Sequence, residues 1–165
     1  MGAKRQGRLL LVEDEKLLRG LIAQFLRAEG FDLVEAGDGR EGVEQFARLG
    51  PFDLVLLDLD LPILPGVEVC RLIKRQQPGQ PVIICSAAIL EEHIEALEAL
   101  RVNQLLSKPY HPAELLHRIA IELERAAGAP GGAREGLAAS GSWRLDPTHS
   151  RPGRSQALFK APLID

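Results

Sequence analysis

The stretch LVLLDLDLP, residues 54–62, decides the fold. Its apolar half leads directly into Asp58, and Asp60 follows after a single leucine. A short continuous apolar run is typical of a strand that is buried on both faces of a parallel sheet. Carboxylates at the end of such a strand lie at the edge where α/β sheets bind their ligands. The stretch therefore predicts a central strand with a functional site at its carboxyl end.

Apolar runs of strand length alternate with amphipathic segments of helix length on both sides of this stretch. The predicted strands are residues 8–12, 31–36, 52–58, 81–87 and 103–108. The predicted helices are residues 16–28, 39–49, 66–77, 91–100 and a last helix from Pro112 through Leu123. Strands that alternate with helices form a parallel sheet whose right-handed crossovers cover both faces. We therefore predict an α/β fold, a doubly wound five-stranded parallel sheet.

Length and composition restrict the class of protein. The 165 residues, 45% of them hydrophobic, suffice for one ordinary domain with its own core. A net charge of -3 is too small to indicate a nucleic-acid or membrane-surface protein. The first residues contain too few apolar side chains for a signal peptide, and no apolar run approaches the roughly 20 residues of a membrane helix. We expect a cytoplasmic protein in which Cys70 and Cys85, both in apolar stretches, are reduced core residues.

Side chains that carry chemistry follow or end four of the five predicted strands. Glu13 and Asp14 follow the first strand, Asp58 ends the third, Ser86 lies at the end of the fourth, and Lys108 ends the fifth. The carboxyl ends of parallel strands lie at one edge of the sheet. We therefore expect these five side chains to gather into one site.

Electrostatics indicates what that site binds. Two carboxylates about 4 Å apart repel by about 4 kcal/mol at an effective dielectric near 20, and Lys108 supplies only one compensating charge. Oxygen ligands with room for water and a phosphoryl oxygen suit Mg²⁺. A carboxylate beside these cations can attack a phosphoryl group and become an aspartyl phosphate. Asp58 is the best-placed nucleophile, and Ser86 can donate its hydroxyl to a phosphoryl oxygen.

The segments LLLVEDE, DLVLLDLDLPILPG, VIICSA and SKPY resemble the response-regulator receiver domain of two-component signalling, as in chemotaxis receivers. The resemblance extends over about residues 7–125, so we assign residues 1–125 to a receiver domain. It implies the flavodoxin-like strand order 2-1-3-4-5. It also implies that Asp58 accepts a phosphoryl group from a sensor histidine kinase or a phosphotransfer protein, which makes the chain a regulatory switch and not an enzyme.

The resemblance also assigns roles within the site. It implies that Asp14, Asp58 and the backbone carbonyl of Asp60 hold Mg²⁺, with Glu13 assisting through water. The position of Asp60, two residues after Asp58, is seldom occupied by an acidic residue in this family. The extra charge of Asp60 either slows phosphorylation or positions the water that hydrolyses the acyl phosphate. The sequence leaves these two alternatives open.

Further roles concern the switch. The resemblance implies that Ser86 is the switch hydroxyl and that Lys108 precedes a cis peptide bond at Pro109. Leu105 stands where the family usually has an aromatic switch residue. The implied output is a change in affinity for a downstream protein, or a homodimer, through the face formed by the fourth helix, the fifth strand and the fifth helix.

An enzyme is the alternative. The segment VLLDLDLP also resembles the motif of haloacid dehalogenase-type phosphatases, in which Asp58 would be the nucleophile and Asp60 the acid-base catalyst. Those enzymes have their metal-binding acids after the lysine, whereas Glu13 and Asp14 precede every other site residue here. The order of the residues favours the receiver.

Residues 126–165 differ in composition, being rich in Gly, Ala, Pro and Ser with no sustained hydrophobic period. The segment SWRLDPTHSRPG faintly resembles the opening strands of winged-helix response regulators of the OmpR type. We expect either a disordered tail or the remnant of a truncated effector domain. Because it contains no helix that could read a DNA groove, we do not expect this chain to bind DNA.

Overall fold

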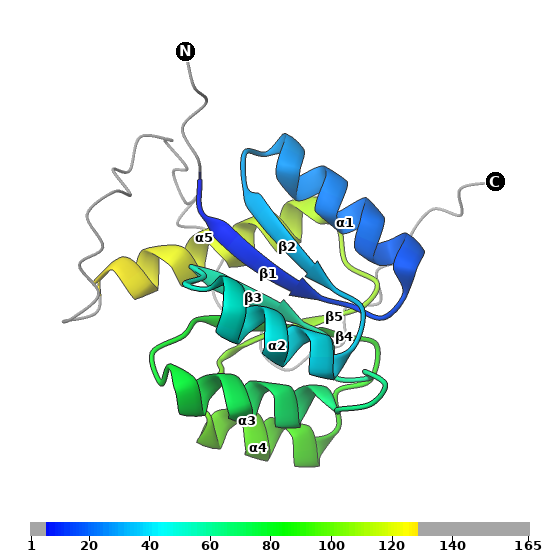
Figure 1. Ribbon diagram of the computed structural model, residues 1–165, viewed down its shortest axis with the longest axis vertical. Helices are drawn as coiled ribbons and strands as arrows, with labels where there is room; N and C mark the ends of the chain where they lie inside the picture. The colour runs from blue at the N-terminus through cyan, green and yellow to red at the C-terminus, as the bar shows by residue number, and fades with distance from the viewer. Residues whose placement is uncertain (1–5, 129–165) are drawn as a thin grey trace, which may run out of the picture.

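Strands and helices alternate along residues 6–128, which are the residues that the computed structural model describes (Figure 1). The strands are β1 (Arg8–Val12), β2 (Asp32–Ala36), β3 (Leu54–Leu57), β4 (Val82–Ser86) and β5 (Gln104–Ser107). The helices are α1 (Lys16–Ala28), α2 (Gly39–Leu49), α3 (Gly66–Gln76), α4 (Glu91–Ala99) and α5 (Pro112–Gly128). All neighbouring strands are parallel, and their order is β2-β1-β3-β4-β5. The predicted fold class and strand order are confirmed.

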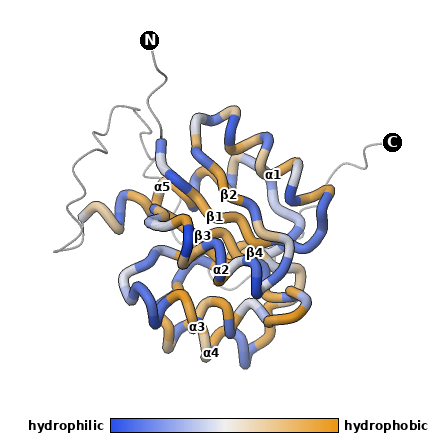
Figure 2. Tube along the Cα trace, in the orientation of Figure 1, coloured by the Kyte–Doolittle hydropathy of each residue, from blue (hydrophilic) through white to orange (hydrophobic). Residues whose placement is uncertain are grey.

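The helices form two layers, one on each face of the sheet (Figure 1). Side chains of α1 and α5 pack against one face, and those of α2, α3 and α4 pack against the other. All four residues of β3 are buried, as expected for a strand covered on both sides. Figure 2 shows the hydrophobic residues concentrated along the strands. Cys70 and Cys85 are buried, unpaired core residues, as predicted.

The start of α3 illustrates how the local sequence places the end of β3. A Cβ atom on Gly66 would lie 2.1 Å from the backbone oxygen of Asp58 and 2.6 Å from the Cα of Leu59. Only glycine permits this approach, because the obstructing atoms belong to the backbone. The N–H of Gly66 also donates to the carbonyl of Leu59 at 2.9 Å. The start of α3 therefore packs directly against the backbone of Asp58 and Leu59 at the end of β3.

The last helix is longer than predicted. Helix α5 continues through Gly128, five residues beyond Leu123, where the predicted helix ends. Residues 129–165, which include most of the predicted tail, lie outside the described part of the chain. Among residues 6–128, no helix combines the length and the apolar character needed to cross a bilayer.

Candidate functional site

Backbone hydrogen bonds that continue the sheet by one residue place the site. The N–H of Asp58 donates to the last residue of β1 at 3.1 Å, and the N–H of Glu13 donates to the last residue of β2 at 3.1 Å. The N–H of Lys108 donates to the carbonyl of Ser86 at 2.9 Å. Side chains that are distant in sequence thus leave the same edge of the sheet.

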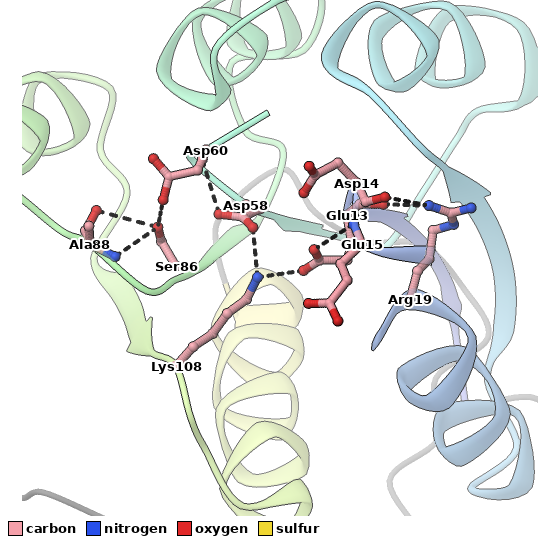
Figure 3. A network of polar contacts seen from close by, with 9 residues as sticks. All are labelled: Glu13, Asp14, Glu15, Arg19, Asp58, Asp60, Ser86, Ala88 and Lys108. Carbon is pink, nitrogen blue, oxygen red and sulfur yellow. Dashed lines mark hydrogen bonds and ion pairs between the residues drawn. The ribbon is translucent and has the colours of Figure 1, made fainter. Parts of the chain in front are cut away.

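The Lys108 ammonium lies at the centre of this group (Figure 3). Its Nζ is 2.6 Å from Oε2 of Glu13 and 2.6 Å from Oδ2 of Asp58. The side chains of Glu13 and Asp58 are 3% and 6% exposed, and that of Lys108 is 15% exposed. Two nearly buried carboxylates are therefore held together by one shared ammonium group.

Burial and charge act against each other in this network. Burial raises the pKa of the Glu13 carboxyl more than its contacts with Lys108 lower it. Burial alone would lower the pKa of Lys108, but hydrogen bonds and charges from Asp58 and Glu13 raise it above its ordinary value. Lys108 is therefore firmly protonated, whereas ionised Glu13 lacks full compensation. The site favours a further cation.

Three carboxylates are close enough to share a metal ion. Glu13, Asp14 and Asp58 each offer an oxygen atom, and these atoms all lie within 4.8 Å of one another. Asp14 is exposed, whereas the other two are buried. Hard oxygen donors of this kind, open to solvent on one side, suit Mg²⁺, which retains several of its waters when bound. The donor set fits the metal expected from the sequence.

Ser86 and Asp60 meet on the other side of Asp58 (Figure 3). Ser86 is fully buried, and its Oγ is 3.3 Å from Oδ2 of Asp60. The N–H of Asp60 donates to Oδ1 of Asp58 at 3.1 Å. Asp60 therefore contacts both Asp58 and Ser86, a juxtaposition that the sequence analysis did not anticipate.

Arg19 is a site residue that the sequence analysis missed. Its Nη1 donates to the carbonyl of Glu13 at 2.7 Å and lies 3.5 Å from the carbonyl of Asp14 (Figure 3). Its Nε lies 3.6 Å from Oε2 of Glu35 in β2. The guanidinium thus holds the backbone of the acidic loop after β1. A cation in the first turn of a helix, where the helix dipole disfavours positive charge, was the available signal.

The remaining predicted residues lie on β5 and just after it. The Lys108–Pro109 peptide bond is cis. Leu105 is partly buried and packs against the core on the α2, α3 and α4 side of the sheet. Leu105 thus places an aliphatic side chain at the position where the resemblance implies that an aromatic residue is usual.

The model of the family described as "Response regulator receiver domain" matches residues 9–120. Among individual relatives, the chain is 39% identical over 140 residues to the sensory transduction protein RegX3 of Mycolicibacterium smegmatis, covering 84% of this chain and 60% of the relative. It is 35% identical over 137 residues to the alkaline phosphatase synthesis transcriptional regulatory protein SphR of Synechococcus elongatus, covering 78% and 53%. The chain thus spans between half and two thirds of these relatives.

A further relative bears on DNA. The DNA-binding response regulator MtrA of Mycolicibacterium smegmatis is 31% identical over 166 residues, which cover 99% of this chain and 69% of MtrA. That name describes MtrA and not this chain. The expectation that this chain does not bind DNA nevertheless gains no support from its relatives.

Solved structures agree with the family match. A CheY-like receiver domain from Methanospirillum hungatei has a TM-score of 0.69 at 25% identity, covering 72% of this chain and 94% of that one. The receiver domain of sensor histidine kinase PA1611 from Pseudomonas aeruginosa, described with magnesium in its active-site cleft, has a TM-score of 0.65 at 29% identity, covering 72% and 98%. With the fold, the acidic cluster and the family match in agreement, the chain belongs to the response regulator receiver domains, the phospho-accepting switches of two-component signalling.

Proposed function

We propose that this chain accepts a phosphoryl group on Asp58 from a phosphohistidine of a sensor kinase or phosphotransfer protein, in the cytoplasm and with Mg²⁺ bound. The observation that carries the proposal is the contact of the Lys108 ammonium with Asp58 and Glu13, 2.6 Å in each case. The Lys108 ammonium can compensate the negative charge of a phosphoryl group placed on Asp58.

The chemistry assigned to Asp58 is a displacement at phosphorus. One carboxylate oxygen of Asp58 attacks the phosphorus atom, so that an O–P bond forms while the N–P bond breaks. The imidazole nitrogen of the donor leaves with the electron pair of that bond. Lys108 stabilises the negative charge on the transferred group, and the N–H of Asp60, which donates to Asp58 at 3.1 Å, helps to fix the orientation of the carboxylate.

The residues proposed to hold Mg²⁺ are Asp14, Asp58 and the backbone carbonyl of Asp60, with Glu13 acting through water. The mutual proximity of the Glu13, Asp14 and Asp58 oxygens, all within 4.8 Å, supports this assignment. A bound Mg²⁺ would neutralise charge on the phosphoryl oxygens. Arg19 would keep the loop that carries Glu13 and Asp14 in place.

The proposed output is a changed affinity for another protein. Ser86 would donate its hydroxyl to a phosphoryl oxygen, which draws the β4–α4 loop toward the site and alters the α4–β5–α5 face. A downstream protein, or a second copy of the chain, would bind this face. Sedimentation of the protein with and without the phosphoryl analogue beryllofluoride tests the homodimer.

Phosphorylation by a small phosphodonor tests the central claim. Acetyl phosphate with Mg²⁺ should add one phosphoryl group, detected by intact mass, and Asp58→Asn should abolish the addition. Asp60→Asn is the matched control, because it removes a carboxylate two residues away and should retain the label. If Asp58→Asn is still labelled, or if only Asp60→Asn loses the label, the nucleophile is a residue other than Asp58.

The same reagents address the phosphatase alternative. A haloacid dehalogenase-type enzyme would turn over a generic phosphomonoester continuously and would need the Asp60 carboxylate for acid-base catalysis. In the structure the Asp60 carboxylate accepts a hydrogen bond from Ser86, a contact that supports the switch function over the phosphatase. We expect no turnover of p-nitrophenyl phosphate above the rate of the Asp58→Asn variant.

A further inference from the structure

The hydroxyl of Ser86 is already hydrogen-bonded in the unphosphorylated chain. Its Oγ lies 3.3 Å from Oδ2 of Asp60, 3.4 Å from the carbonyl of Ala88 and 3.4 Å from the N–H of Ala88. A hydroxyl carries one proton and can donate it to one acceptor at a time. The Asp60 carboxylate is the ionic acceptor of the two, and hydrogen bonds to ionised groups are about twice as strong as neutral ones.

The position of Asp60 allows its side chain both to make this contact and to release it. Its backbone is fixed, because its N–H donates to Asp58 Oδ1. Its side chain extends from there to Ser86 (Figure 3). The residue is exposed, whereas Ser86 is buried, so that water can solvate the carboxylate once the hydroxyl turns away.

A phosphoryl group on Asp58 would compete for the same proton. We propose that Asp60 is a positioning residue that holds the Ser86 hydroxyl in the unphosphorylated arrangement, so that this hydrogen bond must break before Ser86 can contact a phosphoryl oxygen. The inference rests on the proposed function, and it names a regulatory element within that function. The negative charge of Asp60 therefore acts through Ser86, in addition to repelling the phosphoryl group directly.

The two effects of Asp60 are separable, because only one of them requires the hydroxyl. Direct repulsion by the carboxylate remains when Ser86 is replaced by alanine, whereas the hydrogen bond is lost. The experiment therefore uses four proteins: the wild type, Asp60→Ala, Ser86→Ala and the double variant. Binding of beryllofluoride in the presence of Mg²⁺ is titrated for each, and unfolding midpoints verify that all four are folded.

We expect Asp60→Ala to strengthen beryllofluoride binding in both backgrounds, but by a factor on the order of ten more when Ser86 is present, the effect of one charge-assisted hydrogen bond at the weak end of its range. Asp60→Asn, which keeps a neutral acceptor, should give an intermediate gain when Ser86 is present. In the Ser86→Ala background, Asp60→Asn and Asp60→Ala should give equal gains, because both remove the same charge.

Equal gains from Asp60→Ala in both backgrounds would overturn the inference, since the carboxylate would then act only by repulsion. A weaker affinity of Asp60→Ala than of the wild type would overturn it as well. Failure of every protein, the wild type included, to bind beryllofluoride would refute the proposed function together with this inference. Binding by the wild type with no coupling between the two positions would refute this inference alone.

Discussion

Replacement of Lys108 by methionine should destabilise the metal-free protein by an amount that depends on pH. Methionine retains most of the length of the side chain but removes the ammonium that Glu13 and Asp58 share at 2.6 Å. Removing one partner from a buried ion pair costs about 3–5 kcal/mol, because the remaining charge is left without compensation. The side chains of Glu13 and Asp58 are 3% and 6% exposed, so both carboxylates are buried enough for this cost to apply.

Proton uptake limits the loss. A carboxyl with the ordinary pKa of 4.5 becomes neutral at pH 7 at a cost of about 3.4 kcal/mol, since each pH unit contributes about 1.36 kcal/mol. In the variant, protonation of Glu13 therefore limits the destabilisation caused by its uncompensated charge to about 3.4 kcal/mol at pH 7. At pH 5 the same protonation costs about 0.7 kcal/mol. We expect a loss of about 3 kcal/mol at pH 7 that falls below about 1 kcal/mol at pH 5.

Urea unfolding of the metal-free proteins at the two pH values measures this difference. The sign follows from linkage: the folded variant holds a proton at Glu13 that the unfolded chain releases above pH 4.5, so its stability falls as the pH rises. Arg71→Met is the control, because Arg71 pairs with Glu68 where both side chains are more than a third exposed, and it should cost less than about 1 kcal/mol at either pH. A loss below about 1 kcal/mol at pH 7, or an equal loss at both pH values, would refute the electrostatic account of the site.

Three further predictions concern the surroundings of the site. Because burial raises the pKa of Glu13, metal-free wild type should lose stability as the pH rises above 4.5, and Glu13→Gln should flatten this dependence in thermal unfolding between pH 4.5 and 7.5. Arg19→Ala should weaken Mg²⁺ binding about tenfold by calorimetry, because the acidic loop loses its support, whereas Arg27→Ala, which has no contact with that loop in the structure, should not. Gly66→Ala should cost about 3 kcal/mol in urea unfolding because its Cβ would meet a backbone oxygen at 2.1 Å, whereas Gly20→Ala, with no atom within 4 Å, should stabilise helix α1 by about 0.5–1 kcal/mol. Unchanged stability in Gly66→Ala would contradict the close approach of α3 to the end of β3.

Much of the site was predictable because it lies where secondary structure ends. Asp58 directly follows β3 and Lys108 directly follows β5, and any parallel sheet brings such positions to one edge. The strand order places β1 beside β3, so Glu13 and Asp58 follow neighbouring strands, but β4 separates β3 from β5. Topology therefore predicts that these groups lie at one edge of the sheet, whereas the contacts of Lys108 with Glu13 and Asp58 depend on its side chain reaching across β4.

The contacts of Arg19 and Asp60 were not predictable in the same way. Arg19 lies in helix α1, and its side chain could have extended into solvent from the same backbone position. Asp60 lies in the loop between β3 and α3, where the residue spacing does not determine the direction of a side chain. Each contact depends on where a flexible side chain meets a second element, and neither hydrophobic period nor motif spacing contains that information.

The sequence by itself determined the alternation of strands and helices, the buried central strand and the set of ionisable groups at its carboxyl edge, because hydrophobic periodicity and chain order specify these features directly. Only the tertiary structure decided which of these groups pair: Lys108 with Glu13 and Asp58, and Ser86 with Asp60. Pairing depends on distances of a few ångströms between side chains from different strands. Those distances are set by the register and packing of the whole sheet, and no local stretch of sequence specifies them.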